Sequence, residues 1–321
     1  MLRSTSLLAT ILCSGASAHI YRVLDSSFPD PSVVYTGSEY YAFGTTGNGV
    51  YAQVATSPDF TNWTLLEDFD ALPGPYPDWV SDSAVVLWAP DVIKMADGSY
   101  VMYYSAKEKT SGKHCVGVAT SSTAKGPYDA TVSNDSIACP TSQGGAIDPD
   151  GFIDTDGTIY VTYKIDGNSM DGDGTTHSTP IMLQKMHSDG VQVDGDPIQL
   201  LDRDDNDGPL IEAPSVLYYD GIYYLSFSSN YYNTEKYDTS YAYATSITGP
   251  WAKQHAPHAP LLVTGTGSKN AGKLSAPGGS DFSADGKKVV FHANLNGKDG
   301  KDGRAMFVSN ITVSDNIISL A

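Results

Sequence analysis

The sequence predicts an all-β chain folded as a five-bladed β-propeller, in which each blade is a four-stranded antiparallel sheet. Three observations lead to this fold class. A hairpin signature recurs about every sixty residues, strand-like runs rich in β-branched and aromatic residues follow each recurrence, and helical periodicity is nowhere convincing. Such repeats are typical of propellers, whose blades pack face to face around an axis. A β-sandwich with coincidental spacing is the alternative, but sandwiches do not repeat one hairpin five times.

The recurring hairpin is marked by a glycine at its turn. The five turns are Thr36-Gly37, Asp97-Gly98, Asp156-Gly157, Asp220-Gly221 and Asp285-Gly286. Four of them are Asp-Gly pairs, which supply the positive φ angles of a two-residue hairpin loop. The second strands of the blades are predicted at residues 40–45, 100–105, 159–164, 222–228 and 288–293. The third strands are predicted at residues 51–57, 115–121, 181–188, 241–246 and 304–310.

An acidic residue beside a proline precedes four of the five predicted inner strands. These acids are Asp30, Asp91, Asp148 and Glu212. Because the inner strand of every blade starts near the axis, residues at the same place in different repeats are expected to converge on one central pocket. An acid next to proline is also an ordinary turn former. The register that the four positions share argues against coincidence.

Carboxylates gathered in one pocket point to hydrolysis of glycosidic bonds. One carboxylic acid protonates the leaving oxygen, while a carboxylate activates water from the opposite face of the sugar. Opposed blades are expected to hold these two groups roughly 6.5 to 9.5 Å apart, the separation of inverting enzymes. A third carboxylate nearby would keep the acid protonated by like-charge repulsion.

The motifs around these acids resemble glycoside hydrolase family 43, the five-bladed arabinanases, arabinofuranosidases and xylosidases. The resemblance covers essentially the whole chain after residue 18, in FPDPSVV, WAPDV, AIDPDGFIDTDG and LIEAPSV. It implies that Asp30 is the general base, Glu212 the general acid and Asp148 the residue that modulates the pKa of the acid. Asp91 aligns with them, but its family counterpart is not catalytic, and it is interpreted as structural.

The resemblance implies a secreted, inverting hydrolase. The segments YKIDGN and DGPLIEAPS look most like exo-acting α-L-arabinofuranosidases, which release arabinose from arabinan or arabino-oligosaccharides. A β-xylosidase or an endo-1,5-α-L-arabinanase uses the same three acids, so both readings stay open. A carbohydrate-binding propeller without catalysis is the alternative of another class. Phe28 and Trp88 are candidates for stacking on the sugar.

The expected partner is plant cell-wall polysaccharide or oligosaccharide, bound by a monomer. No cofactor is required for the chemistry. The resemblance extends to His292 in VVFHAN, which matches a family histidine near the axis that can help to hold a calcium ion or its waters. A core histidine without a ligand is the more usual outcome.

The first 18 residues have the pattern of a signal peptide, with Arg3, an apolar run at 7–13 and small residues at 16–18. Residues 19–321 are therefore expected to form the secreted catalytic domain, and no later stretch has the length and apolarity of a membrane span. The 37 acidic and 19 basic residues give a net charge of −18. This charge argues against nucleic acid or an anionic membrane as a partner.

The cysteines and three asparagines add expectations about a secreted chain. Cys13 falls in the signal peptide, and an oxidising compartment favours a disulfide between the remaining Cys115 and Cys139. The acceptor pattern for N-glycosylation occurs at Asn62, Asn134 and Asn310.

Overall fold

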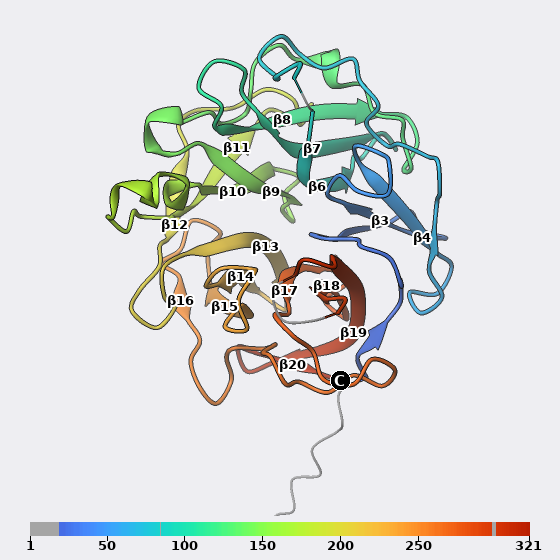
Figure 1. Ribbon diagram of the computed structural model, residues 1–321, viewed down its shortest axis with the longest axis vertical. Coiled ribbons are helices and arrows are strands. Elements are labelled where there is room, and N and C mark those ends of the chain that lie inside the picture. Colours follow the sequence, from blue (N-terminus) through green and yellow to red (C-terminus); the bar gives the residue numbers. More distant parts are fainter. Residues whose placement is uncertain (1–18, 84, 297–299) are drawn as a thin grey trace, which may run out of the picture.

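The computed structural model describes residues 19–83, 85–296 and 300–321. Within them, five antiparallel sheets surround one axis, which confirms the five-bladed propeller (Figure 1). The helical segments of this part of the chain are three short 3-10 helices, Ala130–Val132, Thr141–Gln143 and Gly167–Asp173. None of the described helices is long and apolar enough to cross a membrane. The predicted signal peptide, residues 1–18, lies outside the described residues.

Each blade starts with its inner strand and proceeds outward. Blade one contains β2 (Ser32–Tyr35), β3 (Tyr40–Gly44), β4 (Gln53–Ser57) and β5 (Thr64–Leu65), and blade two contains β6 (Leu87–Lys94), β7 (Tyr100–Lys107) and β8 (His114–Ser121). Blade three contains β9 (Ala146–Ile153), β10 (Ile159–Ile165), β11 (Ile181–Met186) and β12 (Ile198–Leu201). Blade four contains β13 (Ile211–Tyr219), β14 (Ile222–Ser229), β15 (Asp238–Ala244) and β16 (Ala252–Lys253).

Blade five is closed by the beginning of the chain. Its strands β17 (Gly278–Phe282), β18 (Lys288–Asn294) and β19 (Arg304–Ser314) are followed by β1 (Tyr21–Arg22), which pairs with β19. The last strand, β20 (Ile317–Leu320), also pairs with β19. Blade two has three strands, with isolated bridges such as Thr120 to Asp129 beyond β8. The expectation of four strands is therefore met in blades one, three and four.

The hairpin turns lie where the sequence places them, but most are longer than predicted. The second strands match β3, β7, β10, β14 and β18 to within two residues. Blade four has the two-residue loop, in which Asp220 and Gly221 have φ angles of 49° and 84° and Tyr219 pairs with Ile222. In blade three, pairing stops at Ile153 and Ile159, so the loop there is longer.

Apolar packing lies between neighbouring blades, as expected for a propeller. One buried cluster joins blades one and two through Phe43 and Met102, and an equivalent cluster fills each of the other four interfaces. Phe28 belongs to the cluster between blades five and one, where its exposed fraction is 0%. Because the apolar groups fill the interfaces between blades, the axis is left to polar side chains.

A ring of polar side chains ties the inner strands together near the axis. This axial ring takes one equivalent position from each blade: Ser32, Asp91, Asp150, Ser215 and Asp281. Each member makes a hydrogen bond to the next blade, so that Asp91 Oδ2 accepts from Gly151 N at 2.7 Å and Asp281 Oδ2 accepts from Val33 N at 2.7 Å. Asp91 thus has the structural position that its sequence interpretation gave it.

Candidate active site

In blades two to five the inner strand carries a β-bulge two residues before the axial ring. The residue at this position has a positive φ in all five blades: Asp30 (54°), Ala89 (43°), Asp148 (56°), Ala213 (51°) and Gly279 (56°). Bulges redirect side chains and are common beside active sites, and a positive φ is strained for residues other than glycine. Asp30 and Asp148 therefore occupy equivalent positions. The sequence predicts one shared register for all four acids. Glu212 stands one residue before this position and Asp91 two residues after it, so the prediction is wrong for these two acids.

Asp30 is held by donors from blades one and five. Its Oδ2 accepts a hydrogen bond from Thr45 Oγ1 at 2.6 Å, and Arg304 Nη1 lies 2.7 Å from its Oδ1. Burial raises the pKa of this carboxyl, but the Arg304 charge, His292 and the hydrogen bonds outweigh burial and lower the pKa below its ordinary value. Asp30 is therefore ionised at neutral pH, as a general base must be.

Glu212 is fixed from two sides. Lys164 Nζ lies 2.9 Å from Glu212 Oε2, and Tyr237 Oη donates to Glu212 Oε1 at 2.9 Å. The Lys164 side chain is fully buried and also lies 3.2 Å from Asp166 Oδ1. Burial lowers the pKa of Lys164, but the charges of Glu212 and Asp166 outweigh burial and raise it above its usual value. A permanent positive charge therefore lies beside this carboxyl.

The charges of both other acids act on Asp148. Its Oδ2 accepts from Ala213 N at 3.0 Å, and its own N–H donates to Ser105 Oγ at 3.1 Å. Burial and the charge of Glu212 raise the pKa of Asp148 to about 8, with a smaller contribution from Asp30. The three carboxylates that the sequence singled out thus come together at the axis.

Two aromatic rings connect the acid with the base. The Tyr237 ring stacks on the His292 ring, with centroids 5.8 Å apart and planes 6° from parallel. Asp30 N–H donates to His292 Nδ1 at 3.1 Å, so the stack extends from the Glu212 carboxyl to the Asp30 backbone. The side chain of Tyr237 leaves no room for a β-carbon at Gly278, which would lie 2.2 Å from the ring. Glycine at this position is therefore required by the site.

The two aromatic residues proposed to contact sugar have different surroundings. Phe28 is fully buried, with its ring 3.0 Å from a β-carbon built on Gly44, so the prediction that it contacts substrate is wrong. Trp88 is half-buried, and in blade two it stands just before the bulge, as Glu212 does in blade four. It stacks on His114 with ring centroids 3.8 Å apart. Burial lowers the pKa of His114 to about 4, so this ring is neutral.

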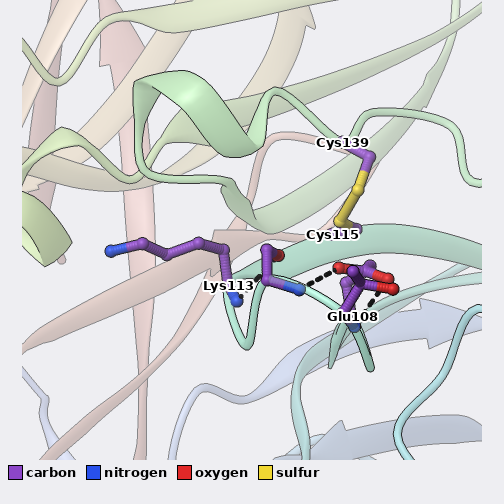
Figure 2. Close-up of a disulfide and its surroundings, with 6 residues drawn as sticks. Glu108, Lys113, Cys115 and Cys139 are labelled. Carbon is purple, nitrogen blue, oxygen red and sulfur yellow. Dashed lines mark hydrogen bonds between the residues drawn. A yellow bond between two sulfur atoms is a disulfide. The ribbon is translucent and has the colours of Figure 1, made fainter.

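The predicted disulfide is present, and it lies close to that stack in sequence. Cys115 follows His114 on β8 and is joined to Cys139 in the connection to blade three (Figure 2). The turn before β8 is ordered by Glu108, whose carboxylate accepts from the N–H groups of residues 110 and 111 (Figure 2). The asparagines proposed for glycosylation are exposed, namely Asn62, Asn134 and Asn310.

A polar groove of about 400 Å³ has Tyr237, the partner of the acid, among its lining residues. It is lined by Asp205, Asn206, Gly208, Asn230, Glu235, Lys236, Tyr237, Val263 and Thr264. Tyr237 connects the groove to the catalytic centre, because its hydroxyl binds Glu212. On the side of the base, the guanidinium of Arg304 lies 4.7 Å from the Tyr232 ring centroid, in cation–π contact.

His292 lies at the axis, where the resemblance suggests a calcium ion, and both of its ring nitrogens face protein groups. Its Nδ1 accepts from Asp30 N, and its Nε2 lies 3.3 Å from the Arg304 guanidinium. Among the residues that the structure describes, no group of three or more His, Cys, Asp or Glu is arranged to hold a metal ion.

Three residues of the site were not identified from the sequence: Lys164, Tyr237 and Arg304. One of them left a signal. Lys164 is the single charge in the apolar run IYVTYKI, and a charge inside a buried strand requires a partner of opposite sign. Arg304 has no comparable signal, because 274 residues separate it from Asp30.

Comparisons with known proteins agree with this geometry. The family model of glycosyl hydrolases family 43 matches residues 22–318. The chain is 28% identical to the extracellular endo-α-(1→5)-L-arabinanase 1 of Bacillus subtilis, over 87% of this chain and 83% of that protein. It is 24% identical to a β-D-galactofuranosidase of Aspergillus niger, over 86% and 77% of the two chains. The crystal structure of a thermostable family-43 glycoside hydrolase superposes with a TM-score of 0.75 at 26% identity, covering 92% of each chain. The protein therefore belongs to glycosyl hydrolases family 43 and is a glycosidase.

Proposed function

We propose that this glycosidase hydrolyses α-L-arabinofuranosyl linkages of arabinan with inversion of configuration. Asp30 is the general base, Glu212 the general acid and Asp148 the residue that controls the proton of the acid. The proposal is carried by the convergence of these three half-buried carboxylates in different environments. Asp30 is paired with a cation and has a lowered pKa, whereas the pKa of Asp148 is raised to about 8. Carboxylates with such divergent environments are suited to acid and base roles.

The reaction is a single displacement at the anomeric carbon. Asp30 takes a proton from a water molecule, whose oxygen forms a bond to the anomeric carbon as the bond to the leaving oxygen breaks. Glu212 gives its proton to that leaving oxygen. Burial and the charge of Glu212 raise the pKa of Asp148 to about 8, so Asp148 retains a proton beside the acid at neutral pH. Lys164 and Tyr237 hold the acid in place during the transfer.

Arabinan is supported as the substrate by the relative from Bacillus subtilis, which is named an arabinanase. Release of single arabinose residues is favoured by the form of the site. The polar groove shares Tyr237 with the acid, and the leaving group must lie on the side of the acid. On the side of the base, Tyr232 covers Arg304. A chain end bound at the axis would place its first sugar there and extend the remaining chain into the groove.

Endo-acting cleavage is the second candidate. It is favoured by the name of the same relative, an endo-α-(1→5)-L-arabinanase. The two modes differ in their first products. Exo action on linear 1,5-α-arabinan releases arabinose from the start, whereas endo action first gives a mixture of oligosaccharides and a rapid fall in viscosity.

Product analysis tests both the function and the mechanism. Linear arabinan and the p-nitrophenyl glycosides of α-L-arabinofuranose and β-D-xylose are incubated with enzyme, and NMR identifies the first anomer released. We expect arabinose as the first product, with inverted configuration. The variants Glu212→Gln and Asp30→Asn are expected to lose at least about a thousandfold in kcat. Glu67→Gln and Asp78→Asn, which change exposed acids, are the matched controls.

Each outcome discriminates between the alternatives. If only the xyloside is hydrolysed, the substrate is xylan oligosaccharides and not arabinan. A retained configuration would contradict the single displacement. Binding of arabinan without hydrolysis would identify a carbohydrate-binding propeller. Unchanged turnover in Glu212→Gln or Asp30→Asn would refute the assigned roles.

Secretion as a glycosylated monomer is the remaining part of the proposal. The relative from Bacillus subtilis is named extracellular, and the proposed glycosylation sites are exposed. Amino-terminal sequencing of protein from the culture medium should begin at His19. If the protein carries N-linked glycans, its mass should exceed the mass of the sequence and should fall after treatment with an N-glycosidase.

A further inference from the structure

Arg304 is the charged side chain in closest contact with the base. It lies at the start of β19, its side chain is 16% exposed, and its Nη1 and Nη2 lie 2.7 Å and 3.4 Å from the two Asp30 oxygens. Tyr232 covers the other face of the guanidinium at 4.7 Å. A planar guanidinium that pairs with both oxygens of a carboxylate fixes its orientation as well as its charge.

The same guanidinium also faces His292. Arg304 Nη1 lies 3.3 Å from His292 Nε2, and the other ring nitrogen accepts the backbone N–H of Asp30. The ring is fully buried, and its Nδ1 carries no proton because it accepts this hydrogen bond. The imidazole is therefore neutral, and the positive charge at this position belongs to Arg304.

A metal ion would compete with these contacts. Calcium needs about six to eight oxygen ligands. Both Asp30 oxygens already accept hydrogen bonds, from Arg304 and Thr45, and a cation at His292 Nε2 would meet the guanidinium. Like charges at such a distance in a buried site repel strongly.

We infer that Arg304 is a positioning residue that supplies the positive charge of the axis and holds Asp30 in the orientation of a base without a metal ion. This inference rests on the proposed function for its kinetic consequence. Its structural consequence, the absence of a calcium site beside His292, does not depend on any substrate.

Calcium binding and the kinetics of Arg304 variants test the inference. Protein dialysed against EGTA is titrated with CaCl2 by calorimetry, and its thermal unfolding is measured with and without CaCl2. We expect no saturable heat and an unchanged midpoint. In Arg304→Met, kcat is expected to fall about a hundredfold with little change in KM, because the base is no longer held in place. Arg304→Lys keeps the charge and should recover part of kcat, while Arg22→Met, at a surface ion pair, is the matched control.

The possible results separate the two proposals. Saturable calcium binding that raises the unfolding midpoint of the wild type would overturn the inference, as would an unchanged kcat in Arg304→Met. If no glycoside is hydrolysed by the wild type, the proposed function fails, and the calcium titration still decides whether the axis holds a metal ion. If Arg304→Met does not fold, Arg304→Lys provides the test. This variant must then show a lowered kcat with a native unfolding midpoint. A wild-type kcat in Arg304→Lys would overturn the inference, because a planar guanidinium would not be needed.

Discussion

Replacement of Asp91 by asparagine should make the propeller more stable at alkaline pH. In the axial ring, Asp91 Oδ2 accepts from Gly151 N, and the carbonyl oxygen of asparagine can accept the same hydrogen bond. Burial and the charge of Asp281 raise the pKa of Asp91 to about 8. An acid whose pKa is higher in the folded than in the unfolded chain stabilises the fold at low pH, and this contribution is lost as the pH rises through the folded pKa.

The magnitude follows from this difference in pKa. Unfolded aspartate titrates near pH 3.9, and each pH unit of difference corresponds to about 1.4 kcal/mol. Between about pH 5 and about pH 8, Asp91 should therefore lower the free energy of unfolding of the wild type by roughly 2 to 4 kcal/mol. Burial also raises the pKa of Asp281, to about 6. The lower figure allows for this neighbour, because the two carboxyl groups do not titrate independently. Asp91→Asn removes this loss.

Urea unfolding at the two pH values provides the measurement. The rise in stability of Asp91→Asn over the wild type should appear near pH 8 and be small near pH 5. Asp78→Asn removes one exposed charge and corrects for the general repulsion in a chain of net charge −18. A wild-type stability that is constant or rises across this range, or an Asp91→Asn variant that is destabilised equally at both pH values, would refute the reasoning.

Three further predictions concern residues around the site. Lys164→Met leaves the general acid without its buried cation. We expect the unfolding free energy to fall by about 3 to 5 kcal/mol and kcat to fall as well. An unchanged unfolding midpoint would contradict this prediction. His114→Ala removes the support of Trp88 and should raise KM for arabino-oligosaccharides several-fold with kcat retained, and His187→Ala, on an exposed turn, is the control. Joint replacement of Cys115 and Cys139 by alanine should lower the unfolding free energy by about 3 kcal/mol, measured in urea, since the bridge closes a loop of 24 residues.

The fold and the three acids could be predicted from the sequence because both depend on local, repeated patterns. Glycine turns and β-branched strands recur in each blade, and acids beside proline mark the strand starts. The exact register of Glu212 could not be predicted in this way. A bulge shifts the inner strands of blades two to five by one residue, and Glu212 stands one position before the residue that is equivalent to Asp30 and Asp148.

The partners of the acids depend on contacts between blades, which no repeat reveals. Arg304 and Lys164 reach the acids from other blades, so their roles appear only when the ring is assembled. Phe28 shows the converse, because an aromatic residue two positions before the base suggests a sugar contact. The chain turns its ring into the interface between blades five and one instead.

The closure of blade five by β1 has a consequence for the order of folding. Tyr21 pairs with Val308, so the first described strand, β1, meets β19 of the carboxyl-terminal blade at one seam of the ring. Asp30 belongs to one side of this seam, and Arg304 and His292 belong to the other. A nascent chain can build its first four blades in sequence, but it cannot hold its catalytic base until the carboxyl-terminal blade has been synthesised. Enzymatic activity should therefore appear last on the folding pathway, and a truncated chain should have a folded centre but an unsupported base.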